Sequence, residues 1–142
     1  RTGQEVFVLR ELGLDSIGID LVEFPPYTIK GDIHNLEFDD EKFDLIFTNI
    51  LDHSLYLEKF ISEMERVCIK DGNIILNIQI NMPGDDYSEN IINDLEPIIN
   101  LFKNSTLIKN REIENIFDRM NRELVFKKLI TTTKTEKKVK KK

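Results

Sequence analysis

The chain has 142 residues, 40% of them hydrophobic, and a formal net charge of −6 at pH 7. This length predicts one globular domain, and no apolar run is long enough to span a bilayer or to form a signal peptide. The acidic balance argues against a dedicated nucleic-acid surface. The single cysteine, Cys68, excludes an internal disulfide and is typical of a reducing compartment, so we expect a cytoplasmic location.

The first half of the chain reads as one helix followed by short buried strands. Val6, Leu9 and Leu12 form an apolar stripe that predicts a helix over residues 3–12, with Gly13 as its terminating residue. Three apolar runs then each end beside a polar residue, which is typical of buried parallel strands. The runs cover residues 17–21, 27–30 and 43–49, and the polar residues are Asp20, Asp32 and Asn49. Ligands bind at the carboxyl ends of such strands.

Two polar connections separate these runs. The adjacent Pro25 and Pro26 favour an extended loop over a helix between the first two strands. Residues 39–41 are three consecutive acids, which cannot converge on one ion, so we interpret them as a solvated turn. His34 and His53 lack a metal-ligand spacing, and we therefore predict no metal site.

The second half predicts further helices and a final pair of strands. The strongest periodicity predicts a helix over residues 55–69, with Ser54 as its N-cap. The remaining expected elements are a turn at 70–72, a strand at 73–80, a helix at 91–102 interrupted by Pro97, strands at 106–108 and 124–126, and a helical turn at 113–120 between them. Residues 131–142 are rich in lysine and poor in apolar side chains, so we expect a disordered tail.

Five short motifs occur in an order and at spacings that match a known family. They are Thr2-Gly3-Gln4, Gly18-Ile19-Asp20, Gly31-Asp32-Ile33-His34, Phe43-Asp44-Leu45-Ile46 and Lys70-Asp71-Gly72. Together they resemble the class I S-adenosylmethionine (SAM)-dependent methyltransferases, specifically the type 11 branch. The resemblance covers a little over half of the chain.

The resemblance implies an α/β fold with a Rossmann-like sheet, mostly parallel, that ends in an antiparallel strand pair. Residues 1–130 would form this SAM-binding domain. The family places a central strand and a Gly-x-Gly loop ahead of Arg1, so we interpret the chain as an N-terminally incomplete fragment. That strand would lie between the strands at 17–21 and 43–49. We therefore expect the chain as given to bind SAM poorly.

The resemblance also implies a role for five residues in binding SAM. At Gly3 the backbone would approach the ligand without a Cβ in the way. Asp20 would accept hydrogen bonds from both ribose hydroxyls, which a carboxylate at a strand end does well. Asp32 would accept from the adenine amino group, beside the backbone N–H of Ile33. Asn49 would face the methionine moiety.

The methyl acceptor is harder to predict, and the acidic body favours a small molecule. Asp52 and His53 are candidate catalytic residues, with His53 as a general base, although methyl transfer needs mainly proximity and alignment. One alternative is a methyltransferase-like binding module or an inactive truncated fragment. Another is an NAD-dependent Rossmann enzyme, but Tyr27 and Tyr56 each precede a lysine by three residues, whereas the short-chain dehydrogenases need four.

Overall fold

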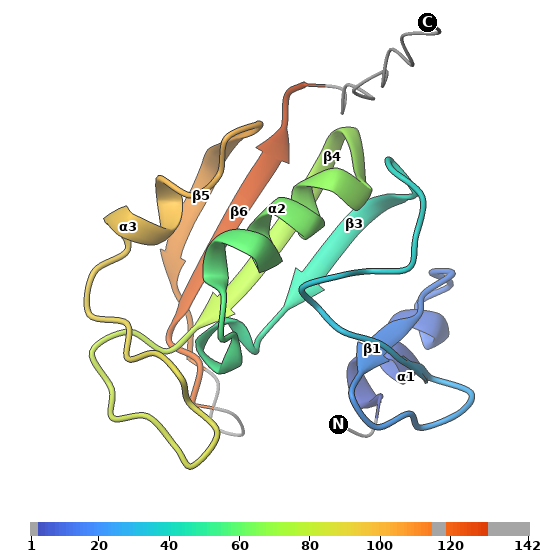
Figure 1. Cartoon of the computed structure of the whole chain (residues 1–142), viewed down its shortest axis with the longest axis horizontal. Helices are drawn as coiled ribbons and strands as arrows, with labels where there is room; N and C mark the ends of the chain where they lie inside the picture. Colours follow the sequence, from blue (N-terminus) through green and yellow to red (C-terminus); the bar gives the residue numbers. More distant parts are fainter. Residues whose placement is uncertain (1–2, 115–118, 131–142) are drawn as a thin grey trace, which may run out of the picture.

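The structure is a computed structural model that describes residues 3–114 and 119–130. One helix and three strands come first, a 3-10 helix, a helix, a strand and a short helix follow, and two strands come last (Figure 1). In chain order they are α1 (Gln4–Glu11), β1 (Gly18–Asp20), β2 (Thr28–Lys30), β3 (Phe43–Thr48), the 3-10 helix η1 (Leu51–His53), α2 (Leu57–Val67), β4 (Cys68–Ile78), α3 (Glu96–Ile99), β5 (Ser105–Glu112) and β6 (Arg122–Lys128).

The strands form two separate sheets. β1 and β2 pair in parallel, with Ile19 opposite Ile29. The larger sheet has the order β3-β4-β6-β5, in which β3 and β4 are parallel and β6 is antiparallel to both of its neighbours. The predicted parallel strands and the predicted closing antiparallel pair are therefore both confirmed. β1 and β3 are not hydrogen-bonded to each other.

Helix α1 ends as its sequence predicts, but of its predicted apolar stripe only Val6 is buried, whereas Leu12 is exposed. Gly13 follows the helix with a φ of 85°, and the Leu14 N–H donates to the Leu9 carbonyl at 3.0 Å, which closes the last turn. A Cβ at Gly18 would lie 3.0 Å from Cγ2 of Val6, the buried residue of α1. The glycine therefore allows α1 to lie directly against β1.

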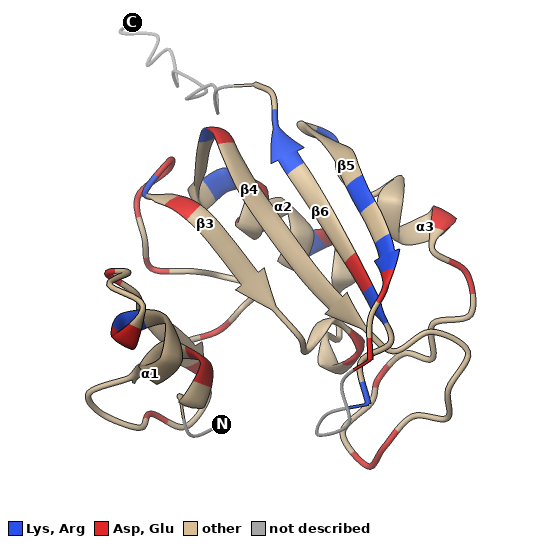
Figure 2. Ribbon diagram, turned by 180° about the vertical axis from the view of Figure 1, so that it is seen from behind, with Lys and Arg blue, Asp and Glu red and all other residues tan. Residues whose placement is uncertain are grey.

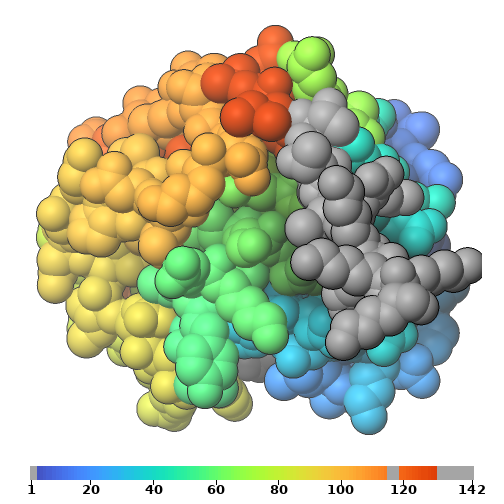
Figure 3. Space-filling model, turned by 45° about the horizontal axis from the view of Figure 1, so that its top comes forward, coloured from blue at the N-terminus to red at the C-terminus, as the bar shows by residue number. Residues whose placement is uncertain are grey.

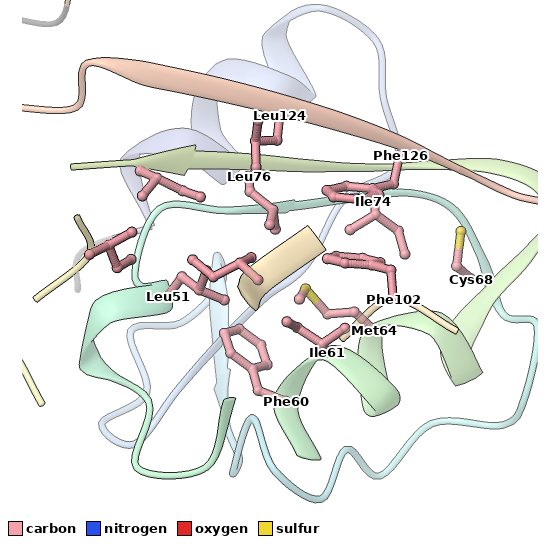
Figure 4. Close-up of a cluster of buried hydrophobic side chains, with 13 residues drawn as sticks. Leu51, Phe60, Ile61, Met64, Cys68, Ile74, Leu76, Phe102, Leu124 and Phe126 are labelled. Carbon is pink, nitrogen blue, oxygen red and sulfur yellow. The ribbon is translucent and has the colours of Figure 1, made fainter. Parts of the chain in front are cut away.

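The hydrophobic core lies between α2 and the larger sheet. Phe60, Ile61 and Met64 point from α2 toward the strands, and Phe102 stacks on Phe126 with ring centroids 3.6 Å apart (Figure 4). The strand residues of this core are Ile74, Leu76 and Ile78 of β4 and Leu124 and Phe126 of β6. Every second residue of each strand faces α2, as a sheet covered on one face requires.

The opposite face of the larger sheet carries no helix in the described part of the chain (Figure 2). By strand alternation Leu45 and Phe47 of β3 point to this face, and their side chains remain 38% and 37% exposed. Helix α1 lies beside this face and not over it. In the space-filling view, the blue and cyan residues of the first third and the yellow and orange residues of the last third lie on opposite sides of green α2 (Figure 3).

The predicted helix at 55–69 is real but shorter, and its predicted cap is wrong. The helix begins at Leu57, with Tyr56 at the N-cap position and no side-chain cap. Ser54 is fully buried, and its hydroxyl lies 2.8 Å from Nε2 of His34 instead of capping the helix. At the other end β4 begins at Cys68, and the predicted turn at 70–72 is an irregularity within this strand, where Asp71 has a φ of 64°.

The predicted helix at 91–102 is mostly wrong. Only Glu96–Ile99 is helical, with Pro97 in its first turn. The Asp94 carboxylate accepts from the Glu96 N–H at 3.0 Å, which fixes this later start. Residues 113, 114, 119 and 120 are not helical, and the rest of the turn predicted at 113–120 lies outside the described residues. The tail from residue 131 also lies outside them.

None of the helices in residues 3–114 and 119–130 is long and apolar enough to cross a membrane.

Candidate functional site

A cavity of about 450 Å³ separates β1 from β3. Four of the five residues predicted to bind SAM line it: Gly3, Asp20, Ile33 and Asn49. The fifth, Asp32, lines a smaller neighbouring cavity of about 90 Å³ together with residues 29–31. The folded chain thus brings the five predicted residues to one region, at the ends of β1, β2 and β3.

The charged side chains of this cavity have one sign. Among the described residues that line it, the charged ones are Glu5, Asp15, Asp20 and Asp44, and none is basic. Glu5 lies near the carboxyl end of β3, because its Oε1 accepts from Nδ2 of Asn49 at 3.4 Å. Such a lining favours a cationic ligand and disfavours a phosphate or pyrophosphate group.

Asp20 closes β1 as a half-buried carboxylate. Its Oδ1 accepts from the backbone N–H of Val22 at 3.1 Å. Desolvation acts to raise the pKa of Asp20, but hydrogen bonds, that from Val22 first among them, hold the pKa below its usual value. Asp20 is therefore ionised near neutral pH and offers charged acceptor oxygens at the cavity.

Gly3 lies at the N-cap of α1 with a φ of 72°, a left-handed conformation that favours glycine. A Cβ at this position would collide with Cβ of Tyr27. The missing side chain therefore lets α1 begin directly against the residue that precedes β2. The close approach at Gly3 is made to the protein's own Tyr27, which the sequence did not predict.

Asp32 belongs to a chain of hydrogen bonds that the sequence did not predict. Its Oδ1 accepts from the backbone N–H of His34 at 2.8 Å and lies 2.9 Å from Nδ1 of the same residue. These two contacts, the backbone bond first, lower the pKa of Asp32. Nε2 of His34 lies 2.8 Å from Oγ of Ser54 and also receives the Tyr56 N–H at 3.4 Å. This geometry fits a proton on Nδ1, with Nε2 as the acceptor.

Arg66 fixes the loop that follows Asp32. Its guanidinium donates to the carbonyls of Leu36 and Phe38 at 2.9 and 2.7 Å and to the carboxylates of Asp40 and Glu63 at 2.9 and 2.8 Å. The expectation of a fully solvated acidic turn at residues 39–41 is therefore wrong for Asp40. Arg66 therefore holds residues 36–40 against α2.

The candidate catalytic pair, Asp52 and His53, lies in η1, outside the lining of the main cavity. Asp52 is buried, and its Oδ2 accepts from the Ser88 hydroxyl at 2.9 Å, so it ties η1 to the loop at residues 85–90. His53 is partly exposed, with Nε2 3.6 Å from Asp52 and 3.8 Å from Asp85. Asp52 therefore has a structural contact, whereas His53 remains accessible.

The family model described as a methyltransferase domain matches residues 2–76. The chain belongs to this methyltransferase family. The match covers more than half of this methyltransferase and ends within β4, so it includes each of the five predicted SAM-binding residues. The predicted membership of the type 11 branch of the class I enzymes is thereby confirmed. A comparison with curated proteins found no match.

Solved structures confirm the fold of this methyltransferase. A protein of Pyrococcus horikoshii OT3 is 19% identical, with a TM-score of 0.70 over 89% of this chain and 77% of that one. The 1,6-didemethyltoxoflavin-N1-methyltransferase of Burkholderia thailandensis, with bound 1,6-didemethyltoxoflavin and S-adenosylhomocysteine (SAH), is 12% identical, with a TM-score of 0.72 over 91% and 68%. A Haloferax volcanii structure that pairs a methyltransferase with a methyltransferase activator is 11% identical, with a TM-score of 0.75 over 91% and 79%.

These likenesses establish a Rossmann-like methyltransferase fold for the chain. The parallel strands, the antiparallel closing pair and the helix on the core face of the sheet all belong to that fold, as predicted. The role of each site residue rests on its own chemistry, because a shared fold does not fix which side chains act.

Proposed function

We propose that this methyltransferase binds SAM with Asp20, Asp32, Ile33, Asn49 and the amino end of α1, and methylates a small molecule. The SAM sulfonium supplies the methyl group. The main support for the proposal is the cavity, whose charged lining residues are all acidic. The sulfonium and the ammonium of SAM are attracted to such a lining, whereas the pyrophosphate of a dinucleotide is repelled. The NAD-dependent alternative is therefore disfavoured. We retain residues 1–130 as the SAM-binding domain of this proposal.

Each residue has a defined task in this proposal. The ionised Asp20 lines the cavity at the end of β1, where it accepts hydrogen bonds from the vicinal ribose hydroxyls. Asp32, held ionised and oriented by His34, accepts from the adenine amino group in the neighbouring cavity. Asn49 closes β3 on the methionine side, where Glu5 contributes further negative charge.

Two observations support a small-molecule acceptor: the composition of the chain is acidic, and the Burkholderia thailandensis structure has a small molecule, 1,6-didemethyltoxoflavin, bound. His53 is the candidate base that would take a proton from the acceptor, because it is accessible and lies just past the end of β3. Asp52, tied to Ser88, would hold η1 in place for it. A protein activator, as in the Haloferax volcanii structure, is a further partner that this fold accommodates.

The experiment that tests the proposal is isothermal titration of SAH onto the protein and onto Asp20→Asn. The variant keeps the shape of the side chain and loses its charge, so we expect at least about a tenfold weaker affinity, or about 1.4 kcal/mol. Glu23→Gln is the matched control, since Glu23 is an exposed acid a few residues further along the same connection.

Equal SAH affinity for the protein and for Asp20→Asn would contradict the proposed contact between Asp20 and the ribose. SAH binding without methyl transfer to any acceptor from a panel of small molecules would favour the binding-module alternative.

A further inference from the structure

The last two strands are basic, although most of the chain is acidic. The described residues 101–114 and 119–130 contain seven basic and three acidic side chains, whereas residues 3–100 contain six basic and twenty-one acidic ones. Figure 2 shows Lys and Arg segments on both β5 and β6. β5 lies at the edge of the larger sheet farthest from β3 and the main cavity. This basic edge is therefore separate from the proposed SAM site.

The outer edge of β5 is unpaired in the described part of the chain, where its partner strand is β6 alone. The Ile113 N–H donates to the Asn121 carbonyl at 3.1 Å, just past the end of β5. Because hydrogen bonding alternates along an antiparallel ladder, the backbone groups of Asn110 and Glu112 point away from β6. The residues from Ile108 to Glu112 are all exposed. Another chain can therefore reach these backbone groups.

The side chains beside this edge carry positive charge. Lys109 stands opposite Val125, and Lys127 lies two residues further along β6 on the same face of the sheet. Neither lysine forms an ion pair with a residue in the described ranges. Arg111 lies on the same face, where its Nε donates to Glu123 at 2.7 Å. Two unpaired ammonium groups thus flank the edge, and they attract a strand that carries carboxylates.

Charge argues against a second copy of this chain as the occupant. Pairing of two β5 strands would bring two basic edges together, and like charges on neighbouring strands are destabilising. Lysines on an edge strand are one of the devices by which proteins prevent such self-association. The acid on β5, Glu112, lies 3.6 Å from Arg122 and is partly neutralised by it. The edge therefore repels a copy of itself and admits an acidic strand.

We propose that the outer edge of β5 binds an extended acidic segment of a partner protein, which adds to the four-stranded sheet as a fifth strand. Asn110 and Glu112 pair with the backbone of this segment. Lys109 and Lys127 bind its carboxylates, and Ile108, which is 54% exposed, contacts an apolar side chain between them. The bound segment leaves the main cavity open, so this inference does not depend on SAM binding.

Fluorescence anisotropy with three labelled ten-residue peptides tests this proposal on the whole chain. The first peptide alternates glutamate with valine. The second has lysine in place of each glutamate, and the third keeps the glutamates but carries a methyl group on every backbone amide nitrogen. We expect the first peptide to bind with a Kd of about 100 μM or below, and the other two at least about tenfold more weakly.

A variant and its control locate the binding site. Lys109→Glu should weaken binding of the first peptide at least about tenfold, because it reverses the charge beside the edge. Lys59→Glu makes the same change at an exposed position of α2 and should leave the affinity unchanged. Hydrogen–deuterium exchange at saturating peptide should slow at the amides of Asn110 and Glu112 at least about tenfold.

Three results would overturn the proposal. Equal affinity for the first peptide and its methylated form would exclude backbone pairing. An equal loss of affinity in Lys109→Glu and Lys59→Glu would show that only the overall charge of the protein matters. A ten-nucleotide single-stranded RNA that binds more tightly than the first peptide, without protecting the Asn110 amide, would assign the basic edge to nucleic acid instead.

Discussion

Nε2 of His34 lies 2.8 Å from Oγ of Ser54, twenty residues further along the chain. This contact joins the loop after β2 to the segment between β3 and α2. Because Nδ1 of the same imidazole lies 2.9 Å from Asp32, the position of the proposed adenine-binding carboxylate depends on a buried hydroxyl on another element. His34 is thus a positioning residue for Asp32.

Ser54→Ala should lower the free energy of unfolding by about 1–2 kcal/mol, because Nε2 of His34 loses its closest partner in a half-buried site. Denaturant titration measures this loss. Ser62→Ala is the matched control, since Ser62 is exposed on α2 and should be close to neutral. ¹⁵N NMR of His34 should show the proton on Nδ1 in the unmodified protein and a mixture of tautomers in Ser54→Ala. A single unchanged tautomer in both would contradict the proposed role.

Glu63 should make the protein lose stability in acid. Desolvation acts to raise the pKa of Glu63, but the hydrogen bonds from Arg66 and Leu36 hold the pKa below its usual value of 4.5. The folded state therefore binds the proton more weakly than the unfolded chain. The resulting stabilisation is fully present above pH 4.5, the pKa of the unfolded chain. It is lost as the pH falls through the lower pKa that Glu63 has in the folded state.

Unfolding measured from about pH 5 to pH 3 should therefore show a shallower loss of stability in Glu63→Gln than in the unmodified protein. Glu58→Gln is the control, because Glu58 is exposed on the same helix and should leave the profile unchanged. Parallel profiles for all three proteins would show that the Glu63 contacts are not kept in solution.

Arg66→Lys should release the loop at residues 36–40 from α2. A lysine ammonium is a point charge and cannot reach two carbonyls and two carboxylates at once. We expect a loss of about 1–3 kcal/mol in the free energy of unfolding, together with faster amide exchange at Leu36, whose N–H donates to Glu63. The opposite substitution, Lys59→Arg at an exposed position of α2, should change neither the free energy of unfolding nor the amide exchange at Leu36. Unchanged protection at Leu36 in Arg66→Lys would refute this role.

Local sequence patterns predicted the family and most of the elements around the candidate site. Short apolar runs beside Asp20, Asp32 and Asn49 were enough to locate β1, β2 and β3, because buried parallel strands are continuous in hydrophobicity and end in polar residues. The apolar stripe and Gly13 located α1 for the same local reason. Such patterns depend only on residues that are a few positions apart, so they can be identified in the sequence alone.

The partners of the polar side chains depend on how the chain folds, and local patterns do not specify them. Ser54 reads as a helix cap in sequence but binds His34, and Asp40 reads as a solvated acid but pairs with Arg66, because both partners are brought in by folding from twenty or more residues away. The helix expected at 91–102 shrank to Glu96–Ile99 for a similar reason, since the Ile92 carbonyl accepts from the distant Asn81 N–H. The division of the strands into two sheets and the cavity between β1 and β3 are likewise properties of sheet topology, which local hydrophobicity does not specify.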